Sequence, residues 1–418
     1  MSTGIKVRLS IMMFLEFFIW GAWFVSMGTH LTNSLGFSAA DSALAYATQS
    51  WGAIIAPFII GLIADKYVNA ERLLGVIHLI GAALMYMLAN ATEFAAFYPY
   101  VLGYMILYMP TLALVNAISF RQTDDPARHF GVIRAFGTLG WIVAGLLISL
   151  VFAWDSSAGV AAGLLRYTFI MAAVASLALG IFSFTLPRTP PTKGGTGGLR
   201  EALGLDALGL LRDRNFLTFF VASILICIPL AFYYQNGNPF LVEIGVEQAT
   251  AWQGVGQGAE FFFMLLVPFF LKRFGMKLTL LIGMLAWAAR YVLFAYGNEG
   301  QLFFVLLVGI ALHGVCYDFF FVSGQLFTDS KAGPRHKSAA QGLITLATYG
   351  VGMLIGFWIA GQLTDAFAVA AGGHDWRSIW LYPAAFAALV AVLFALLFRN
   401  EVVAYKPAAT VTPVRNHG

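Results

Sequence analysis

Five ionisable side chains lie inside long apolar runs of this sequence, where a charge is expensive to place. They are Glu16, Arg134, Glu260, Arg290 and Asp318, and the run around Glu260 reads WQGVGQGAEFFFMLLVPFF. A charge at the middle of a bilayer costs roughly 2.5–3.5 kcal/mol on insertion scales. Such residues persist where they face a wet cavity or a partner. They are therefore the first candidates for a transport site.

The composition indicates what kind of scaffold must position these charges. The chain has 418 residues, of which 60% are hydrophobic and 11% are charged, whereas a soluble domain carries about 25% charged residues. A helix needs about 20 apolar residues to cross the hydrocarbon core. The apolar runs are continuous rather than alternating, which favours helices over a barrel. We therefore expect an all-α integral membrane protein.

Twelve membrane spans can be read from the apolar runs, and a polar segment at residues 187–214 divides them into two sets of six. This pattern predicts an N-terminal six-helix bundle at 1–187, a cytoplasmic loop at 188–213, a C-terminal six-helix bundle at 214–400 and a cytoplasmic tail at 401–418. The twelve spans lie at about 8–31, 43–64, 72–91, 97–120, 131–153, 164–186, 215–236, 250–271, 277–296, 301–325, 338–364 and 377–398.

The distribution of basic residues predicts the orientation of these spans. With the N-terminus placed inside, 20 of the 24 Lys and Arg residues fall in cytoplasmic segments. Only Arg166 and Arg377 lie outside, and Arg134 and Arg290 lie within spans. This bias follows the positive-inside rule and places both termini in the cytoplasm. It also explains the net charge of +4 without any role in nucleic-acid binding.

The sequence offers little support for enzyme chemistry. The two cysteines, Cys227 and Cys316, fall singly within spans and indicate packing rather than a disulfide or a metal site. There is no metal-ligand spacing, phosphate loop, nucleophile elbow or dinucleotide motif. We expect no cofactor and a monomer. A signalling receptor is disfavoured because the tails are short. The first span is not followed by a signal-peptide cleavage site, so we expect it to stay in the protein as a membrane span.

The loop between the second and third spans supports a two-bundle transporter. It reads GLIADKYVNAER from Gly61 to Arg72, which resembles the G-x-x-x-D-[RK] signature of the major facilitator superfamily. Asp65 and Lys66 would lie at a helix end, where they can bond across a cytoplasmic gate. In such transporters two six-helix halves rock about a site near the membrane midplane.

Several stretches resemble a narrower family, the nucleoside:proton symporters. The resemblance runs from about residue 8 to residue 400 and implies proton-driven uptake of nucleosides across a bacterial inner membrane. The similar stretches are FFIWGAW (17–23), YMPTLALVNAISF (108–120), IRAFGTLGW (133–141), GLDAL (204–208), GQGAEFFFMLLVPFFLKRFG (256–275), AWAARYVLFAYG (286–297) and YDFFFVSGQLF (317–327).

The resemblance also implies site residues. In that family an arginine and a threonine of span 5 line the site, a glutamine and a glutamate of span 8 contact substrate, and an aspartate of span 10 is important for function. The matching residues here are Arg134, Thr138, Gln257, Glu260 and Asp318.

Other positions depart from the family pattern. Trp141 stands in place of a phenylalanine, and His313 and Tyr317 replace a tyrosine and a phenylalanine. Glu16 stands where a relative has a glutamine. These departures leave open a second substrate class, another small polar solute such as a sugar or a modified nucleoside. Two span 7 ligands of the family fall at Ala231 and Tyr234, with Tyr233, Gln235 and Asn236 close by.

Spacing alone supports a polar cavity. Residues at i, i+4 and i+7 share one face of a helix, and four spans carry polar or aromatic side chains in that pattern. Carboxamides and arginine can bond ribose hydroxyls and base edges, while an aromatic ring can stack on a base. The four sets are Arg134, Thr138 and Trp141; Gln253, Gln257 and Glu260; Glu16, Trp20 and Trp23; and Gln341, Thr345 and Thr348.

Some of these residues have a simpler interpretation as packing. In this interpretation Gln253 and Gln341 bond a neighbouring helix and nothing else. Trp20 and Trp23 fill space between helices. His30 and His78 are single histidines, which are usually satisfied locally.

Proton coupling needs a group that changes protonation during the transport cycle. A carboxyl group in a dry cavity favours its neutral form, and a nearby arginine favours the ionised form. We therefore expect Glu260 and Asp318 to carry the proton, with Glu16 as an additional candidate. Arg290 is expected to support Asp318 electrostatically. Sodium coupling stays an alternative.

Overall fold

The computed structural model describes residues 2–59, 67–123, 126–191, 205–370 and 372–400. Within these ranges the chain is helical apart from loops and one isolated pairing of Ala368 with His374. Asp65, Lys66 and the expected tail at 401–418 lie outside the described residues. The expected all-α membrane fold is confirmed.

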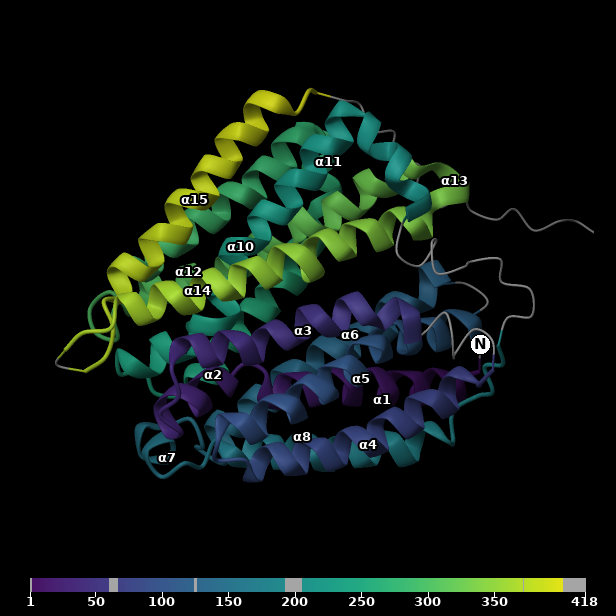
Figure 1. The fold of residues 1–418 in the computed structure, drawn as a ribbon. Helices are drawn as coiled ribbons and strands as arrows, with labels where there is room; N and C mark the ends of the chain where they lie inside the picture. The colour runs from purple at the N-terminus through teal and green to yellow at the C-terminus, as the bar shows by residue number, and fades with distance from the viewer. Residues whose placement is uncertain (1, 60–66, 124–125, 192–204, 371, 401–418) are drawn as a thin grey trace, which may run out of the picture.

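The first half of the chain forms one bundle, drawn in purple to blue in Figure 1. Short π turns, η1 (His30–Ser34) and η3 (Leu147–Val151), extend the ends of two of its spans. Its helices are α1 (Thr3–Trp23), α2 (Met27–Thr29), α3 (Ala39–Ile59), α4 (Ala70–Asn90), α5 (Phe94–Arg121), α6 (Pro126–Leu146), α7 (Ser157–Ala161) and α8 (Arg166–Ser183).

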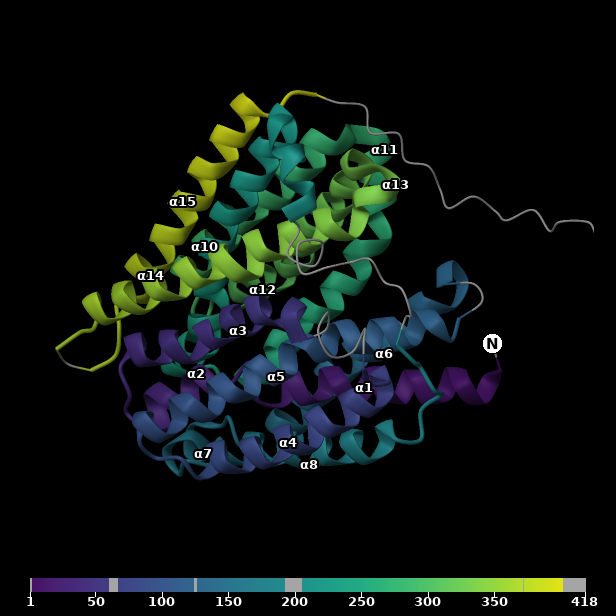
Figure 2. The same ribbon diagram turned by 45° about the vertical axis from the view of Figure 1, so that its right-hand side comes forward.

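The second half forms another bundle, drawn in teal to yellow in Figures 1 and 2. It is preceded by a short 3₁₀ helix, η4 (Leu205–Arg212), and includes two π turns, η5 (Asp318–Val322) and η6 (Leu346–Gly352). Its helices are α10 (Arg214–Glu243), α11 (Ala249–Tyr296), α12 (Phe303–Tyr317), α13 (Ser323–Thr345), α14 (Met353–Ala366) and α15 (Trp376–Leu397). The expected boundaries of the halves stay predictions.

The number of spans follows from the helix lengths. Among the described residues, ten helical stretches are long and apolar enough to cross a membrane. One of them, α11, has 48 residues, about 72 Å at 1.5 Å per residue, which is too long for one crossing of about 30 Å. Gly275 breaks it with a φ of 74°, a backbone region that glycine enters without strain. Counting α11 as two spans and adding α3 gives the twelve spans expected from the sequence.

Helix caps fix where two spans of the second half begin. The Asp213 carboxylate caps α10 by accepting a bond from Phe216 N at 2.8 Å, and it pairs with Lys331 Nζ at 3.1 Å. Partial desolvation opposes ionisation of Asp213, but the Phe216 amide and Lys331 outweigh it and hold the pKa of this carboxyl below its usual value. Asp375 caps α15 in the same way, through Ser378.

The two halves are joined at the end of the molecule opposite the N-terminus. Asp365 of α14 accepts bonds from Ala39 N and Ala40 N at 2.8 and 2.9 Å. Asp155 Oδ2 accepts a bond from Thr250 N at 2.9 Å, at the start of α11. Thr29 of α2 also donates to Asn238 of α10 at 2.6 Å. In both ribbon views the halves diverge toward the end that carries the N-terminus (Figures 1 and 2).

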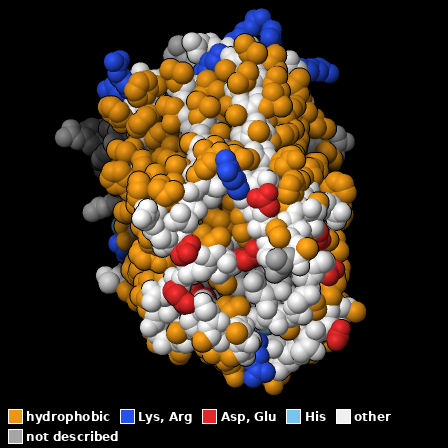
Figure 3. All heavy atoms as spheres, turned by 90° about the vertical axis from the view of Figure 1, so that its left-hand side faces the viewer, with side chains coloured by type: hydrophobic (Ala, Val, Ile, Leu, Met, Phe, Trp, Pro, Cys, Tyr) orange, Lys and Arg blue, Asp and Glu red, His pale blue; other side chains and the backbone are white. Residues whose placement is uncertain are grey.

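This joined end carries several acidic side chains. Figure 3 views it directly and shows acidic side chains gathered around the middle of the face. They include Asp41, Glu243 and Asp365, which the helix and loop positions place at this end. The outside location of this end stays a prediction from the distribution of Lys and Arg.

Candidate functional site

The polar stripe of α6 lies partly open to solvent between the two halves. Arg134, Thr138 and Trp141 are each half-buried, and α6 packs against α11 of the other half. The Arg134 guanidinium carbon lies 4.1 Å from the centre of the Phe17 ring, a cation–π contact. Trp141 meets Trp20 edge to face at 5.5 Å. The expected spacing therefore presents three site residues on one accessible face.

The facing stripe of α11 carries Gln257 and Glu260, and both are also half-buried. The Glu260 side chain is 16% exposed, and its Oε2 lies 4.0 Å from His313 Nε2. The charges of Arg134 and Asp318 also act on this carboxyl group. Among the described residues, Arg134 and Glu260 form no direct ion pair. A ligand between α6 and α11 could contact both.

Close packing between α11 and α12 brings Glu260 next to His313. A Cβ on Gly314 would come within 2.6 Å of the Ala259 carbonyl and Glu260 N, and one on Gly256 would lie 3.1 Å from Ile310 O. The absence of side chains therefore lets the two helix backbones approach, as expected for small residues within membranes. A larger residue at Gly314 would push His313 away from Glu260.

Arg290 contacts the His313 ring beside the site. It is fully buried, and its Nη1 lies 3.0 Å from His313 Nδ1. The guanidinium carbon lies 3.6 Å from the centre of the Tyr233 ring. Among the described residues it has no carboxylate within ion-pair distance, so it does not contact Asp318 directly. The face of the aromatic ring offsets part of the cost of burying this cation.

Asp318 occupies an unusual backbone position. It begins the π turn η5 that interrupts the helix after α12, and such turns occur frequently at functional sites. The side chain is buried, and neither carboxyl oxygen has a hydrogen-bond partner among the described residues. An uncompensated buried carboxylate is costly. That property suits a group that takes up a proton.

Tyrosines form another wall of the site. Tyr317 OH and Tyr349 OH lie 2.6 Å apart, which ties α12 to η6. Tyr234 of α10 packs edge to face at 5.8 Å against Phe24, the residue that follows α1, so it bridges the halves. Sequence reasoning missed Tyr349, although it lies four residues after Thr345 and continues that helix face.

Glu16 lies apart from these residues, inside the N-terminal bundle. It is fully buried, with Oε2 at 2.9 Å from His78 Nε2 and Oε1 at 2.5 Å from Thr111 Oγ1. Tyr108 OH donates to its carbonyl oxygen at 2.7 Å, and Ser176 Oγ lies 3.0 Å from His78 Nδ1. These contacts link α1 to α4, α5 and α8. Its role in coupling stays a prediction.

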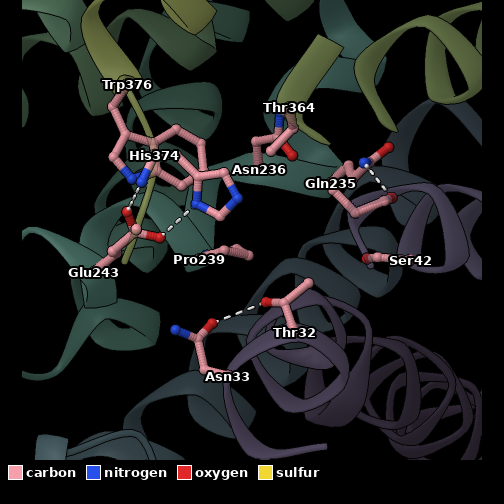
Figure 4. Close-up of a pocket in the computed structure, with 12 residues that line it drawn as sticks. Thr32, Asn33, Ser42, Gln235, Asn236, Pro239, Glu243, Thr364, His374 and Trp376 are labelled. Carbon is pink, nitrogen blue, oxygen red and sulfur yellow. Dashed lines mark hydrogen bonds and ion pairs between the residues drawn. The ribbon is translucent and has the colours of Figure 1, made fainter. Parts of the chain in front are cut away.

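Gln235 lies nearer the joined end, in the wall of a separate pocket of about 200 Å³ (Figure 4). Its Nε2 donates to Ala39 O across the halves at 3.2 Å. Glu243 binds His374 on the far side of the pocket, with Oε2 at 2.8 Å from Nδ1. The pocket is lined by Thr32, Asn33, Ala39, Ser42, Gln235, Asn236, Pro239, Glu243, Thr364, Gly373, His374 and Trp376.

The other glutamines of the sequence pattern serve helix packing. Gln253 Oε1 accepts a bond from Asn238 at 2.7 Å, and Gln341 Nε2 donates to Asp329 at 2.8 Å. Both were open to this interpretation from the sequence. In the part of the chain that the structure describes, no group of three or more His, Cys, Asp or Glu residues could hold a metal ion.

Comparisons with known proteins agree with this geometry. A family model described as "Nucleoside H+ symporter" matches residues 2–402. The chain is 43% identical to the putative nucleoside transporter YegT of Escherichia coli K12 over 96% of each chain. It is 35% identical to the xanthosine permease of the same organism, over 95% of this chain and 96% of that one. The crystal structure of nucleoside transporter NupG superposes with a TM-score of 0.85 at 30% identity, covering 96% of this chain and all of that one.

Proposed function

Because this chain belongs to the nucleoside H+ symporter family and acts as a proton-coupled nucleoside transporter, we propose that its nucleoside binds between α6 and α11. The family is one of transporters rather than enzymes. The many apolar helices of this chain and its permease relatives fit a multi-pass protein of the bacterial inner membrane. The observation that carries the proposal is the pair of half-buried polar stripes that face each other from the two halves.

The chemistry of each stripe suits a different part of a nucleoside. Arg134, Gln257 and Thr138 supply donors and acceptors for ribose hydroxyls and base edges. Trp141 supplies a flat ring on which the base can stack. Further contacts come from Tyr234, His313 and Tyr317. Gln235, the remaining expected ligand, lines the separate pocket near the joined end.

The proton is carried by Glu260 and Asp318 in this proposal. Glu260 is reachable from the cavity, so it can exchange a proton with water or sense a bound ligand. Asp318 lies five residues after His313, and among the described residues no donor stabilises its charge. Glu16 is a third candidate from the sequence, but its carboxylate is enclosed by His78 and Thr111.

The arrangement of the halves supports a cytoplasm-facing state. The site residues keep solvent access while Asp365, Asp155 and Asn238 join the halves at the other end. With both termini in the cytoplasm, the joined end is the outer gate. Transport then needs these contacts to break as the opposite end closes. No cofactor is required, and one chain holds a complete site.

A ligand panel on the purified protein tests the substrate class. Uridine, adenosine and xanthosine should each raise the melting temperature or give a binding isotherm, while sugars of similar size should not. Arg134→Ala should abolish the response to nucleosides. Binding of a sugar with no binding of any nucleoside would favour the alternative of another small polar solute.

A further inference from the structure

We propose that Arg290 is a positioning residue for proton coupling, which acts by holding His313 with its ring proton on Nε2, aimed at the Glu260 carboxylate. The inference rests on the proposed role of Glu260 as the proton carrier. It concerns a fully buried arginine that touches neither the cavity nor, among the described residues, any carboxylate.

The tautomer of His313 follows from the chemistry of its neighbour. A guanidinium group has five N–H donors and no acceptor. Arg290 Nη1 lies 3.0 Å from His313 Nδ1, so Nδ1 must be the acceptor in this bond. The single proton of the neutral ring then lies on Nε2, the nitrogen on the Glu260 side.

The same contact keeps His313 from acting as a proton carrier itself. A second ring proton would have to sit on Nδ1, where it would meet the Arg290 donor and place two cations side by side. Both side chains are buried, with exposures of 1% and 0%, and like charges repel strongly where water is excluded. His313 therefore works as a fixed donor.

The distance between this donor and Glu260 suits a contact that forms and breaks. The separation of Nε2 and Oε2 is 4.0 Å, longer than a hydrogen bond. A change in the Glu260 side-chain rotamer that moves Oε2 by about 1 Å would shorten this separation to a hydrogen bond of 2.7–3.2 Å. A donor at bonding distance stabilises the ionised carboxylate, and its loss favours the protonated form. The state of this one contact can thus decide whether Glu260 holds its proton.

Other charged or polar groups that face Glu260 act on it without Arg290. They are Arg134 from α6, Asp318 from η5, Tyr234 from α10, and Tyr317 and Tyr349 from the tyrosine wall. Arg290 differs because its closest link to the carboxyl group is the His313 ring. Its effect should therefore disappear when that ring cannot accept its bond.

A double-mutant cycle on the full-length protein in proteoliposomes tests this dependence. Uptake of labelled uridine is measured against pH for the wild type, Arg290→Met, which removes the donors, His313→Phe and the double variant. Each single substitution should move the pH midpoint upward by about 1–2 units, the effect of losing one hydrogen bond to a charged group. The double variant should shift no further than His313→Phe. Additive shifts, or unchanged midpoints, would overturn the proposal.

Two further measurements keep the test decisive. If Arg290→Met does not fold, ¹⁵N spectra of histidine-labelled wild-type protein, assigned with His313→Phe, should still show a neutral Nε2–H ring between pH 5 and 8. An imidazolium in that range would overturn the proposal. Glu260→Gln tests the proposed function on which this inference rests. If this variant keeps the wild-type pH dependence, Glu260 is not the proton carrier. Additive shifts in the double-mutant cycle would instead contradict the role of Arg290 alone.

Discussion

The Asp365 carboxylate of α14 caps the first turn of α3 in the other half, with Oδ1 at 2.8 Å from Ala39 N. The corresponding contact in the other direction joins Asp155 to Thr250 N, at the start of α11, at 2.9 Å. Each carboxylate follows the fifth span of its half and caps the second span of the other. Because helix N-termini carry partial positive charge, this pair of caps stabilises the joined end of the transporter.

Asp365→Asn should weaken the joined end. The two carboxylate oxygens accept one hydrogen bond each, from Ala39 N and Ala40 N, whereas an amide has a single acceptor oxygen. The charge–dipole attraction of about 0.3–1 kcal/mol is also lost. That free energy corresponds to a roughly two- to fivefold rise in the open population. A cysteine introduced at Ser42, which is buried, should react correspondingly faster with a bulky maleimide.

The native cysteines should react little with the maleimide, and Asp41→Asn serves as a matched control. The native thiols, Cys227 and Cys316, are buried. Asp41→Asn removes a carboxylate from the same helix end, but Asp41 bonds Ser38 within its own half. It should leave the reaction rate unchanged. Equal rates in the Asp365 and Asp41 variants would show that the cap does not bias the equilibrium.

Glu16→Gln should retain proton-driven accumulation of nucleoside but lower the melting temperature. The carboxylate is enclosed by His78 and Thr111, and breaking such a buried charged network destabilises a protein by roughly 3–5 kcal/mol when a partner is left unpaired. His78→Ala should be the more damaging change, because it leaves Glu16 without its ring partner. Loss of accumulation in a folded Glu16→Gln protein would assign it to coupling.

Trp141→Ala should weaken nucleoside binding. Stacking on an aromatic side chain contributes about 1–3 kcal/mol per base elsewhere, and Trp141 is half-buried on the α6 face that carries Arg134. Trp141→Phe keeps a ring and should bind within a few-fold of the wild type by calorimetry. Phe136→Ala, an exposed position of α6, is the control. Equal affinity in all three variants would remove Trp141 from the site.

Asp213→Ala should lower the melting temperature at neutral pH, by the loss of a helix cap worth about 1 kcal/mol. The pKa of Asp213 is lowered in the folded protein, despite desolvation, by Phe216 N and Lys331. Its stabilisation is therefore present above the unfolded pKa and is lost as the pH falls through the folded value. The difference from the wild type should shrink below about pH 4. Thr218→Ala, one turn further along α10, should show no such pH dependence.

The sequence predicted the parts of the site that lie along one helix. Helical spacing grouped Arg134, Thr138 and Trp141 on one face of α6, and Gln257 and Glu260 on one face of α11. In the structure all five side chains are half-buried, and their roles in binding stay predictions. The same rule grouped Glu16 with Trp20, but it cannot distinguish a face that lines a cavity from a face buried against neighbouring helices. Helical spacing therefore could not show that Glu16 is enclosed within the N-terminal bundle rather than exposed to the cavity.

Contacts between helices were beyond the reach of the sequence. Arg290 was expected to support Asp318, yet its side chain lies on Tyr233 and bonds His313, 23 residues away in the chain. The caps that join the halves link residues over 326 positions for Asp365 and Ala39. Such pairs depend on how spans pack, which local spacing does not encode.

Accumulation of labelled uridine in proteoliposomes, driven by an imposed pH gradient, tests the central claim that Glu260 carries the coupled proton. Wild-type protein should concentrate uridine on the side toward which protons flow. Glu260→Gln should still bind and equilibrate uridine but should not concentrate it, because the amide cannot take up and release a proton. Concentration by Glu260→Gln to the wild-type ratio would contradict the account.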